Sequence, residues 1–196
     1  SYKKFAMIVT RNGSTYSGAT ATSIITIGEM SFNGHRENDL VRLPDPTHVL
    51  RYPHISMIQP DDLSNSGSGS TSTEVSKRGY TVTGSSSYTN DRIERAFRGG
   101  NTATDIRWRS ELNTYTTNGA NGGTLGVYTG SWLKLELPHK IVLSQIKYYA
   151  YDSTYAPESY VILASNNDTD WVKLHDATGQ TNGTFTISSF SEGTPS

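Results

Sequence analysis

The chain has 196 residues, a formal net charge of −1 and no cysteine, and 34% of its residues are hydrophobic. The lack of cysteine excludes disulfides and thiolate metal sites, and the near-neutral charge gives no electrostatic footprint for nucleic acid or an acidic membrane. No apolar run approaches the roughly eighteen residues of a membrane-spanning helix. The 50 serines and threonines, together with 10% aromatic residues, are typical of an all-β protein with many polar turns.

The first expected elements are two strands joined by a polar loop. Residues 2–10 predict a strand in which Phe5, Met7 and Val9 share one face. Residues 24–34 predict the return strand, which ends at Gly34. One face of this second strand is expected to carry Ile25, Ile27, Glu29 and Ser31.

Residues 38–77 differ in character from the sequence on both sides. Pro44, Pro46 and Pro53 fix their own φ angles and disfavour helix in the residues before them, so an extended chain is expected. The Ser/Gly tract at 64–73 lacks apolar anchors and is expected to be mobile. We interpret 38–77 as an extended linker between a strand pair in 1–37 and the main part of the domain in 78–196.

The remaining sequence predicts further strands and one short helix. Residues 90–100 favour a helix because Asn90 can cap it, Ile93 and Phe97 share a face, and Gly99 can end it. Alternating or continuous apolar runs predict strands at 78–88, 132–138, 141–151, 160–164, 171–174 and 184–187. The whole pattern predicts an antiparallel β-sandwich of about eight strands.

Three segments carry a resemblance to a known family. They read AFRGGNTATDIRWRS, GSWLKLELPHKIVLSQIKYYAY and APESYVILASNNDTDWVKLHD. In their order and spacing they resemble the discoidin family, the coagulation-factor C-type domains and their galactose-binding relatives, including domains found in tandem in large structural proteins of algal viruses. The resemblance implies a jelly-roll β-sandwich and covers residues 78–187.

The order of the segments departs from the family pattern. The strand pair that ends such domains matches residues 2–10 and 27–34, which here begin the chain. This strand pair would close the sheet that otherwise stops near the weak strand 184–187. Two interpretations follow: a circularly permuted chain that closes its own sandwich, or a piece of a tandem array that exchanges strands with neighbouring copies in an ordered multimer or filament.

The resemblance also implies a structural calcium ion, held by oxygen ligands of a turn and by a glutamate of the last strand. The residues carried over are Asn101, Thr104 and Glu29, with Asp105 as a substitute ligand. The family's turn aspartate corresponds here to Arg98, which cannot bind a cation. The alternative is therefore that Arg98 pairs with Glu29 and replaces the ion.

Sugar-binding relatives use loops at one end of the sandwich, where aromatic faces and amide donors contact the ligand. The corresponding residues here are Tyr115, Asn118, Asn121, Tyr128, Tyr151, Asp152 and Tyr155. The alternative interpretation is that these tyrosines pack on loop edges or on a neighbouring subunit. Three glycosylation sequons begin at Asn12, Asn167 and Asn182, all in expected turns.

No catalytic constellation is visible in the sequence. The five histidines lack a metal-ligand spacing such as His-x-x-x-His. We therefore expect no enzyme, but a structural or adhesive repeat at a virion surface or in an extracellular assembly, whose partners are neighbouring copies of itself. The alternative is a carbohydrate-binding module that recognises cell-surface glycans. Neither nucleic acid nor membrane insertion is expected.

Overall fold

The computed structural model describes residues 1–12, 24–37, 49–58, 74–88, 91–98, 107–111, 115–116, 119–120, 122–150, 155–179 and 184–187. Within them the chain is an all-β protein with antiparallel strand pairing. The strands are β1 (Tyr2–Asn12), β2 (Thr26–Arg36), β3 (Leu50–Tyr52), β4 (Glu74–Lys77), β5 (Tyr80–Gly84), β6 (Trp108–Arg109), β7 (Tyr115–Thr116), β8 (Gly119–Ala120), β9 (Thr124–Leu125), β10 (Tyr128–Thr129), β11 (Ser131–Ala150), β12 (Pro157–Ser165), β13 (Val172–Ala177) and β14 (Thr184–Ile187).

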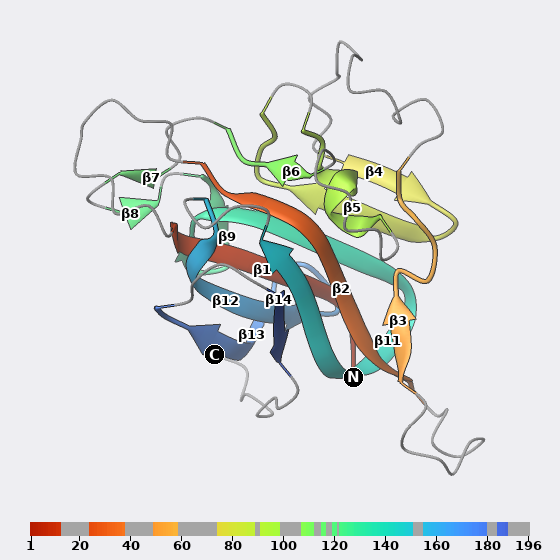
Figure 1. Ribbon diagram of the computed structural model, residues 1–196. Helices are drawn as coiled ribbons and strands as arrows, with labels where there is room; N and C mark the ends of the chain where they lie inside the picture. The colour runs from red at the N-terminus through yellow and green to blue at the C-terminus, as the bar shows by residue number, and fades with distance from the viewer. Residues whose placement is uncertain are drawn as a thin grey trace.

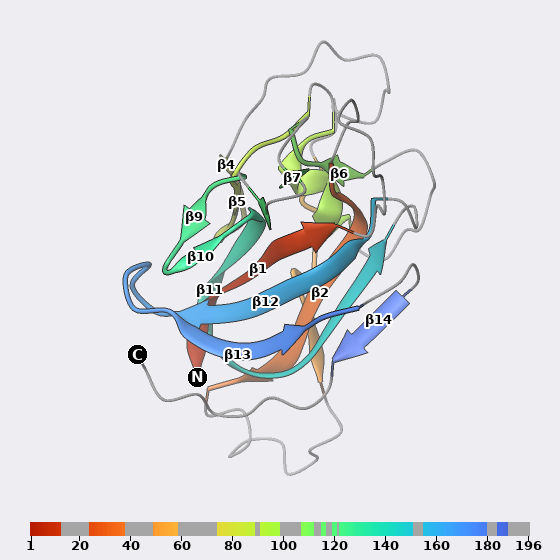
Figure 2. The ribbon, with the colours of Figure 1, turned by 90° about the vertical axis from the view of Figure 1, so that its left-hand side faces the viewer.

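The long strand β11 takes part in both layers of the sandwich. Its first half pairs with β1 and β5, and its second half pairs with β2 and β14. One layer therefore has the order β13-β12-β1-β11-β5-β4, and in the other β2 is flanked by β11 on one side and by β3 and β6 on the other. Figure 1 looks onto the layer of β2, and Figure 2 shows β13, β12 and β1 side by side. The sandwich class predicted from the sequence is confirmed.

The main core lies between the two layers. Phe5 of β1 meets Phe32 of β2 with ring centroids 5.4 Å apart, and Tyr148 of β11 meets Tyr160 of β12 at the same distance. Aromatic pairs of this kind add to the stabilisation that comes from burying their area. Other members of the main core include Met7, Val9, Ile27, Met30, Leu133, Leu135, Leu137, Ile146 and Ile162.

Strand β1 is an inner strand with both faces buried. Phe5 and Met7 face the main core, whereas Ala6 and Ile8 face an outer cluster that also contains Trp171. The hairpin of β9 and β10 covers this outer cluster. Because β1 pairs with both β12 and β11 of its own chain, the described strands close the sheet intramolecularly. The N-terminal strand β1 thus joins the sheet of the C-terminal strands, as the sequence predicted. It lies between β12 and β11, inside the layer, and not at the edge of the layer.

Strand β2 contains a bulge that the sequence pattern did not predict. The ladder with β11 shifts between the pairs Glu29–Tyr149 and Ile27–Ala150, which leaves Gly28 as an extra residue. A Cβ atom on Gly28 would lie 2.9 Å from the Tyr149 ring, so a residue without a side chain suits this position. The bulge places Ile27 and Met30 in the same core and turns Glu29 away from it, so the expected common face of Ile27 and Glu29 is wrong.

Two further expectations are corrected by the described residues. The segment expected as a helix forms the 3₁₀ helix η2 (Ile93–Phe97), which has no side-chain cap, while Asn90 and Gly99 lie outside the described residues. The range expected as a linker contains β3, which pairs with β2, and β4, which pairs with β5. Short strands of this kind carry too few residues for their periodicity to be read. The Ser/Gly tract at 64–73 lies outside the described residues.

Candidate functional site

The glutamate expected as a calcium ligand lies between two arginines. One carboxylate oxygen of Glu29 pairs with the guanidinium of Arg51 on β3. The other oxygen accepts a hydrogen bond from the backbone amide of Arg98 at 3.2 Å, and its distance to Nε of Arg98 is 3.7 Å. The pairing of Arg98 with Glu29, which the sequence left open as an alternative to an ion, is therefore present in the structure.

Arg98 is the more deeply buried partner of this pair. The Arg98 side chain is 2% exposed, and burial lowers the pKa of its guanidinium while Glu29 partly offsets that change. The guanidinium still carries its charge at neutral pH, because arginine stays protonated in proteins. Asn101, Thr104 and Asp105 lie outside the described residues, and within the described part no group of His, Asp or Glu side chains has the arrangement of a metal site.

A second carboxylate, Asp91, faces three arginines. Its oxygens lie 3.5 Å from Arg95, 4.0 Å from Arg107 and 2.5 Å from Arg109. Backbone hydrogen bonds fix this geometry, because the amide of Asp91 donates to the carbonyl of Tyr88 and the amide of Tyr88 donates to the carbonyl of Arg109. The guanidinium carbon of Arg109 also lies 4.3 Å from the centre of the Tyr88 ring, which is cation–π geometry.

A third group of charged side chains lies at the start of η2. Glu94 is 1% exposed, and its carboxylate lies 3.8 Å from Arg92, the residue before η2. We name the whole set the arginine cluster: Arg51, Arg92, Arg95, Arg98, Arg107 and Arg109, with Glu29, Asp91 and Glu94. It contains twice as many cationic as anionic side chains among the described residues.

The short strand β6 explains why Arg109 faces outward. Its neighbours Trp108 and Ser110 are completely buried. Trp108 donates from Nε1 to the carbonyl of Ser86 at 2.9 Å, and Ser110 accepts at Oγ from the amide of Ile25 at 2.9 Å. Since side chains alternate along a strand, anchoring these two residues turns Arg109 to the opposite side. The Trp-x-Ser motif thus holds an arginine at the surface.

Several chain segments come together at one end of the sandwich, which we call the loop end. Asn12, the last residue of β1, pairs with Pro157, the first residue of β12. The amide of Thr26, the first residue of β2, donates to the carbonyl of Tyr155 at 2.9 Å. Arg109 pairs with the same Thr26, so the Asp91 part of the arginine cluster borders the loop end.

The described residues include three of the set expected to bind sugar. Tyr155 lies at the loop end, and Tyr115 belongs to β7, which pairs with β8. Tyr128 packs, partly buried, on the outer cluster through the β9–β10 hairpin. Tyr128 thus has a contact of the kind that the packing interpretation expects. Asn118, Asn121, Tyr151 and Asp152 lie outside the described residues.

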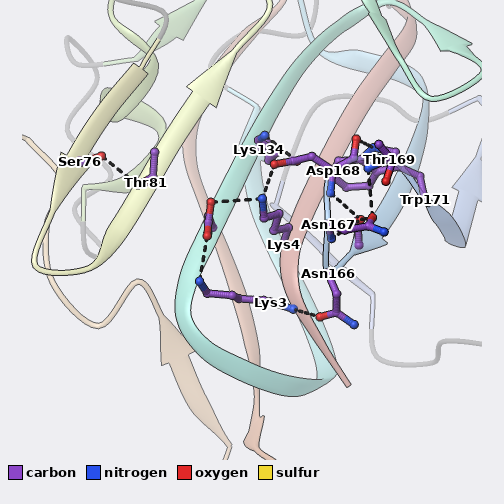
Figure 3. Close-up of polar contacts among 12 residues, drawn as sticks. Lys3, Lys4, Ser76, Thr81, Lys134, Asn166, Asn167, Asp168, Thr169 and Trp171 are labelled. Carbon is purple, nitrogen blue, oxygen red and sulfur yellow. Dashed lines mark hydrogen bonds and ion pairs between the residues drawn. The ribbon is translucent and has the colours of Figure 1, made fainter.

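A second polar network lies on the outer face of the layer that contains β1 (Figure 3). Lys4 on β1 pairs with Asp168 in the β12–β13 turn, and Lys134 on β11 lies 2.7 Å from the other oxygen of Asp168. Glu136 accepts ion pairs from Lys3 at 2.9 Å and from Lys4 at 3.5 Å. The two contacts of Asp168 hold the β12–β13 turn against β1 and β11, so we assign this network a structural role.

The acidic groups of this network are held in their charged forms. Burial acts to raise the pKa of Asp168, but hydrogen bonds and charges of Lys134 and Lys4 outweigh it and set the pKa below its ordinary value. Glu136 behaves in the same way, with burial opposed by Lys3 and Lys4, and its pKa is lowered. Burial acts to lower the pKa of Lys4, but its contacts with Asp168 and Glu136 raise it overall.

The sequons differ in accessibility. Asn12 is 7% exposed at the end of β1, so the expected accessibility of this site is wrong, because the strand pairing that encloses Asn12 leaves no room for an oligosaccharide. Asn167 lies in the exposed β12–β13 turn, where Oδ1 accepts hydrogen bonds from the amides of Thr169 and Asp170. Asn182 lies outside the described residues.

Sequence reasoning missed the part of the arginine cluster around Asp91. Tyr88, Arg107 and Arg109 were not among the predicted site residues. One signal was present, since five of the chain's arginines fall between residues 92 and 109. A dense group of arginines next to buried motif residues, in a chain of near-neutral net charge, indicates a local function for the charge.

Comparison of the chain with protein-family models, with curated proteins and with solved structures found no match. The resemblance to the discoidin family therefore stays an expectation based on sequence motifs. Among the described residues, no helix has the length and apolar character needed to cross a membrane.

Proposed function

We propose that this chain is a non-catalytic adhesive β-sandwich that recognises glycans through its loop end. The observation that carries the proposal is the contact of Thr26 with both Tyr155 and Arg109. Through this contact an aromatic residue and a guanidinium, which lie far apart in the sequence, belong to one end of the molecule. Glycan recognition needs both kinds of group, because aromatic rings cover the apolar face of a sugar and fixed donors bind its hydroxyls.

The scaffold suits this role. The closed pairing of β1 with β12 and β11 makes the strands a rigid support, and loops held on rigid elements are where binding residues commonly lie. The segments between β1 and β2 and between β11 and β12 are rich in Ser, Thr and Tyr. We place the module at a virion surface or in an extracellular assembly, where a glycan-binding module meets its ligands.

Binding of the isolated chain to a glycan array tests the proposal. We expect binding that is lost in Tyr155→Ala and kept in Tyr2→Ala, because Tyr2 lies at the opposite end of β1. Both variants should melt cooperatively before they are compared. Absence of glycan binding by the wild-type chain would refute the proposal.

A second function, a structural repeat that associates with neighbouring copies, is supported by the position of β13. This strand is the last one in its layer among the described strands. A strand at a sheet edge can accept a strand from another chain. Sedimentation over a wide concentration range tests this function, and a monomer at every concentration would exclude self-association of the isolated chain.

A further inference from the structure

We propose that the ligand of the loop end carries an acidic group, a carboxylate or a sulfate ester, and that Arg109 binds this group beside the ring of Tyr88. This inference rests on the proposed glycan recognition and specifies the chemical class of the glycan. It assigns to Arg109 a role in ligand binding in addition to its contact with Asp91.

The first support is the geometry of Arg109. Its Nε faces Asp91 at 2.5 Å and its guanidinium stacks on Tyr88, yet 26% of the side chain is exposed. These two contacts fix the orientation of the guanidinium without covering it. A guanidinium held in this way loses little conformational freedom when it binds an anion, and its planar set of donors matches the oxygens of a carboxylate or a sulfate.

The second support is the charge of the arginine cluster. Six arginines face three carboxylates among the described residues. Glu111, which follows Arg109 by two residues, is a further acidic residue, and the undescribed segments 89–90 and 99–106, which flank η2 and β6, contribute Asp105. With Glu111 and Asp105 included, six cationic side chains stand against five anionic ones, so an excess of one positive charge remains. Positive potential in a partly buried site favours an anionic ligand.

The third support is the location of the excess charge. Arg109 pairs with Thr26, and the amide of Thr26 is hydrogen-bonded to Tyr155. A sugar that contacts Tyr155 would therefore have its acidic substituent within the region of Arg109. The chain as a whole has a net charge of −1, which favours a locally bound acidic group over a long polyanion that follows an extended basic surface.

The experiment compares matched pairs of ligands. We would measure the affinity of the wild-type chain for sialyllactose and lactose, and for a sulfated heparin disaccharide and its desulfated form. We expect at least one acidic sugar to bind about tenfold or more tightly than its neutral partner, because hydrogen bonds between charged groups are stronger than those between neutral groups. Added salt should weaken the acidic ligand more than the neutral one.

Variants then locate the effect. Arg109→Gln should remove the preference for the acidic sugar and weaken the acidic sugar more than the neutral one, because the glutamine amide can still donate to a hydroxyl but carries no charge. Arg109→Lys keeps the charge without the planar fork and should retain part of the preference. Arg36→Gln, at the far end of β2, is the matched control and should change neither affinity.

The outcomes separate the two proposals. Equal binding of acidic and neutral sugars by the wild-type chain would refute this inference and leave glycan recognition intact, and this comparison needs no variant. Unchanged preference in a folded Arg109→Gln variant would also refute it. No glycan binding would refute both proposals, and binding of inorganic sulfate or of a DNA oligonucleotide in place of the sugars would assign the cluster to a different ligand class.

Discussion

Met7 lies directly opposite Ile162 in the antiparallel ladder between β1 and β12. Both side chains are buried in the main core, and on its other side Met7 pairs with Leu133 of β11. A strand from the start of the chain is thus joined, at the centre of one layer, to two strands from its second half. The free energy of folding therefore depends on residues that the sequence places far apart.

Met7→Ala should destabilise the protein by about 2–5 kcal/mol, the cost of deleting a fully buried methionine side chain and leaving a cavity. Lys3→Ala is the matched control, because Lys3 is partly exposed and its ion pair with Glu136 lies at the surface, so we expect a change below about 1 kcal/mol. Urea denaturation measures both values. Equal midpoints for the two variants would contradict the inner position of β1.

Removal of residues 1–34 should abolish cooperative folding. The truncation separates β12 from β11 and leaves both with unpaired backbone groups, a state that favours aggregation. Circular dichroism and light scattering of fragment 35–196 test this. A soluble fragment that melts cooperatively would show that the remaining strands form a domain of their own.

Strands with clear apolar runs could be predicted from the sequence. Residues 184–187 form β14 within the predicted bounds, and the predicted run 160–164 lies within β12. The 20-residue strand β11 was expected as two strands, because Pro138 and His139 interrupt its alternation while the backbone continues through them. What failed were features that depend on distant partners, such as the bulge at Gly28.

The candidate site was less predictable than the fold. Glu29 and Arg98 were connected through the family resemblance, and their contact is present. Arg109 had no such signal, since its position depends on the burial of Trp108 and Ser110 and on backbone bonds to Tyr88 and Asp91. Burial and hydrogen bonds across the fold cannot be read from local periodicity.

The network around Asp168 predicts a loss of stability in acid. The pKa values of Asp168 and Glu136 are lower in the folded chain than in the unfolded chain. Their contribution is therefore present above the ordinary carboxylate pKa of about 4 and is lost as the pH falls through the lowered values. Because Asp168 is 35% exposed, solvent screens the ion pairs, and we expect an effect on the order of 1 kcal/mol.

Asp168→Asn isolates this effect. Asp168 has a φ of 66°, and asparagine tolerates this left-handed conformation as well as aspartate does. The variant should be less stable than the wild type at pH 7, and the difference should shrink as the pH falls below about 4. Thermal melting at a series of pH values provides the test. A constant difference at all pH values would show that the charge of Asp168 does not stabilise the turn.

The final prediction concerns calcium at Glu29. Both oxygens of Glu29 already contact arginine groups, and a divalent cation placed there would be repelled by the guanidiniums of Arg51 and Arg98. We therefore expect the same melting temperature for the wild-type chain in excess calcium and in a chelator.

The variant Arg98→Met keeps most of the buried volume but removes one guanidinium, so its melting temperature should become more sensitive to calcium than that of the wild type. A calcium-dependent rise in the melting temperature of the wild-type chain would instead show a bound ion, because a ligand that binds the folded state stabilises it. In that case Glu29, Asn101, Thr104 and Asp105 would be the residues to replace one at a time.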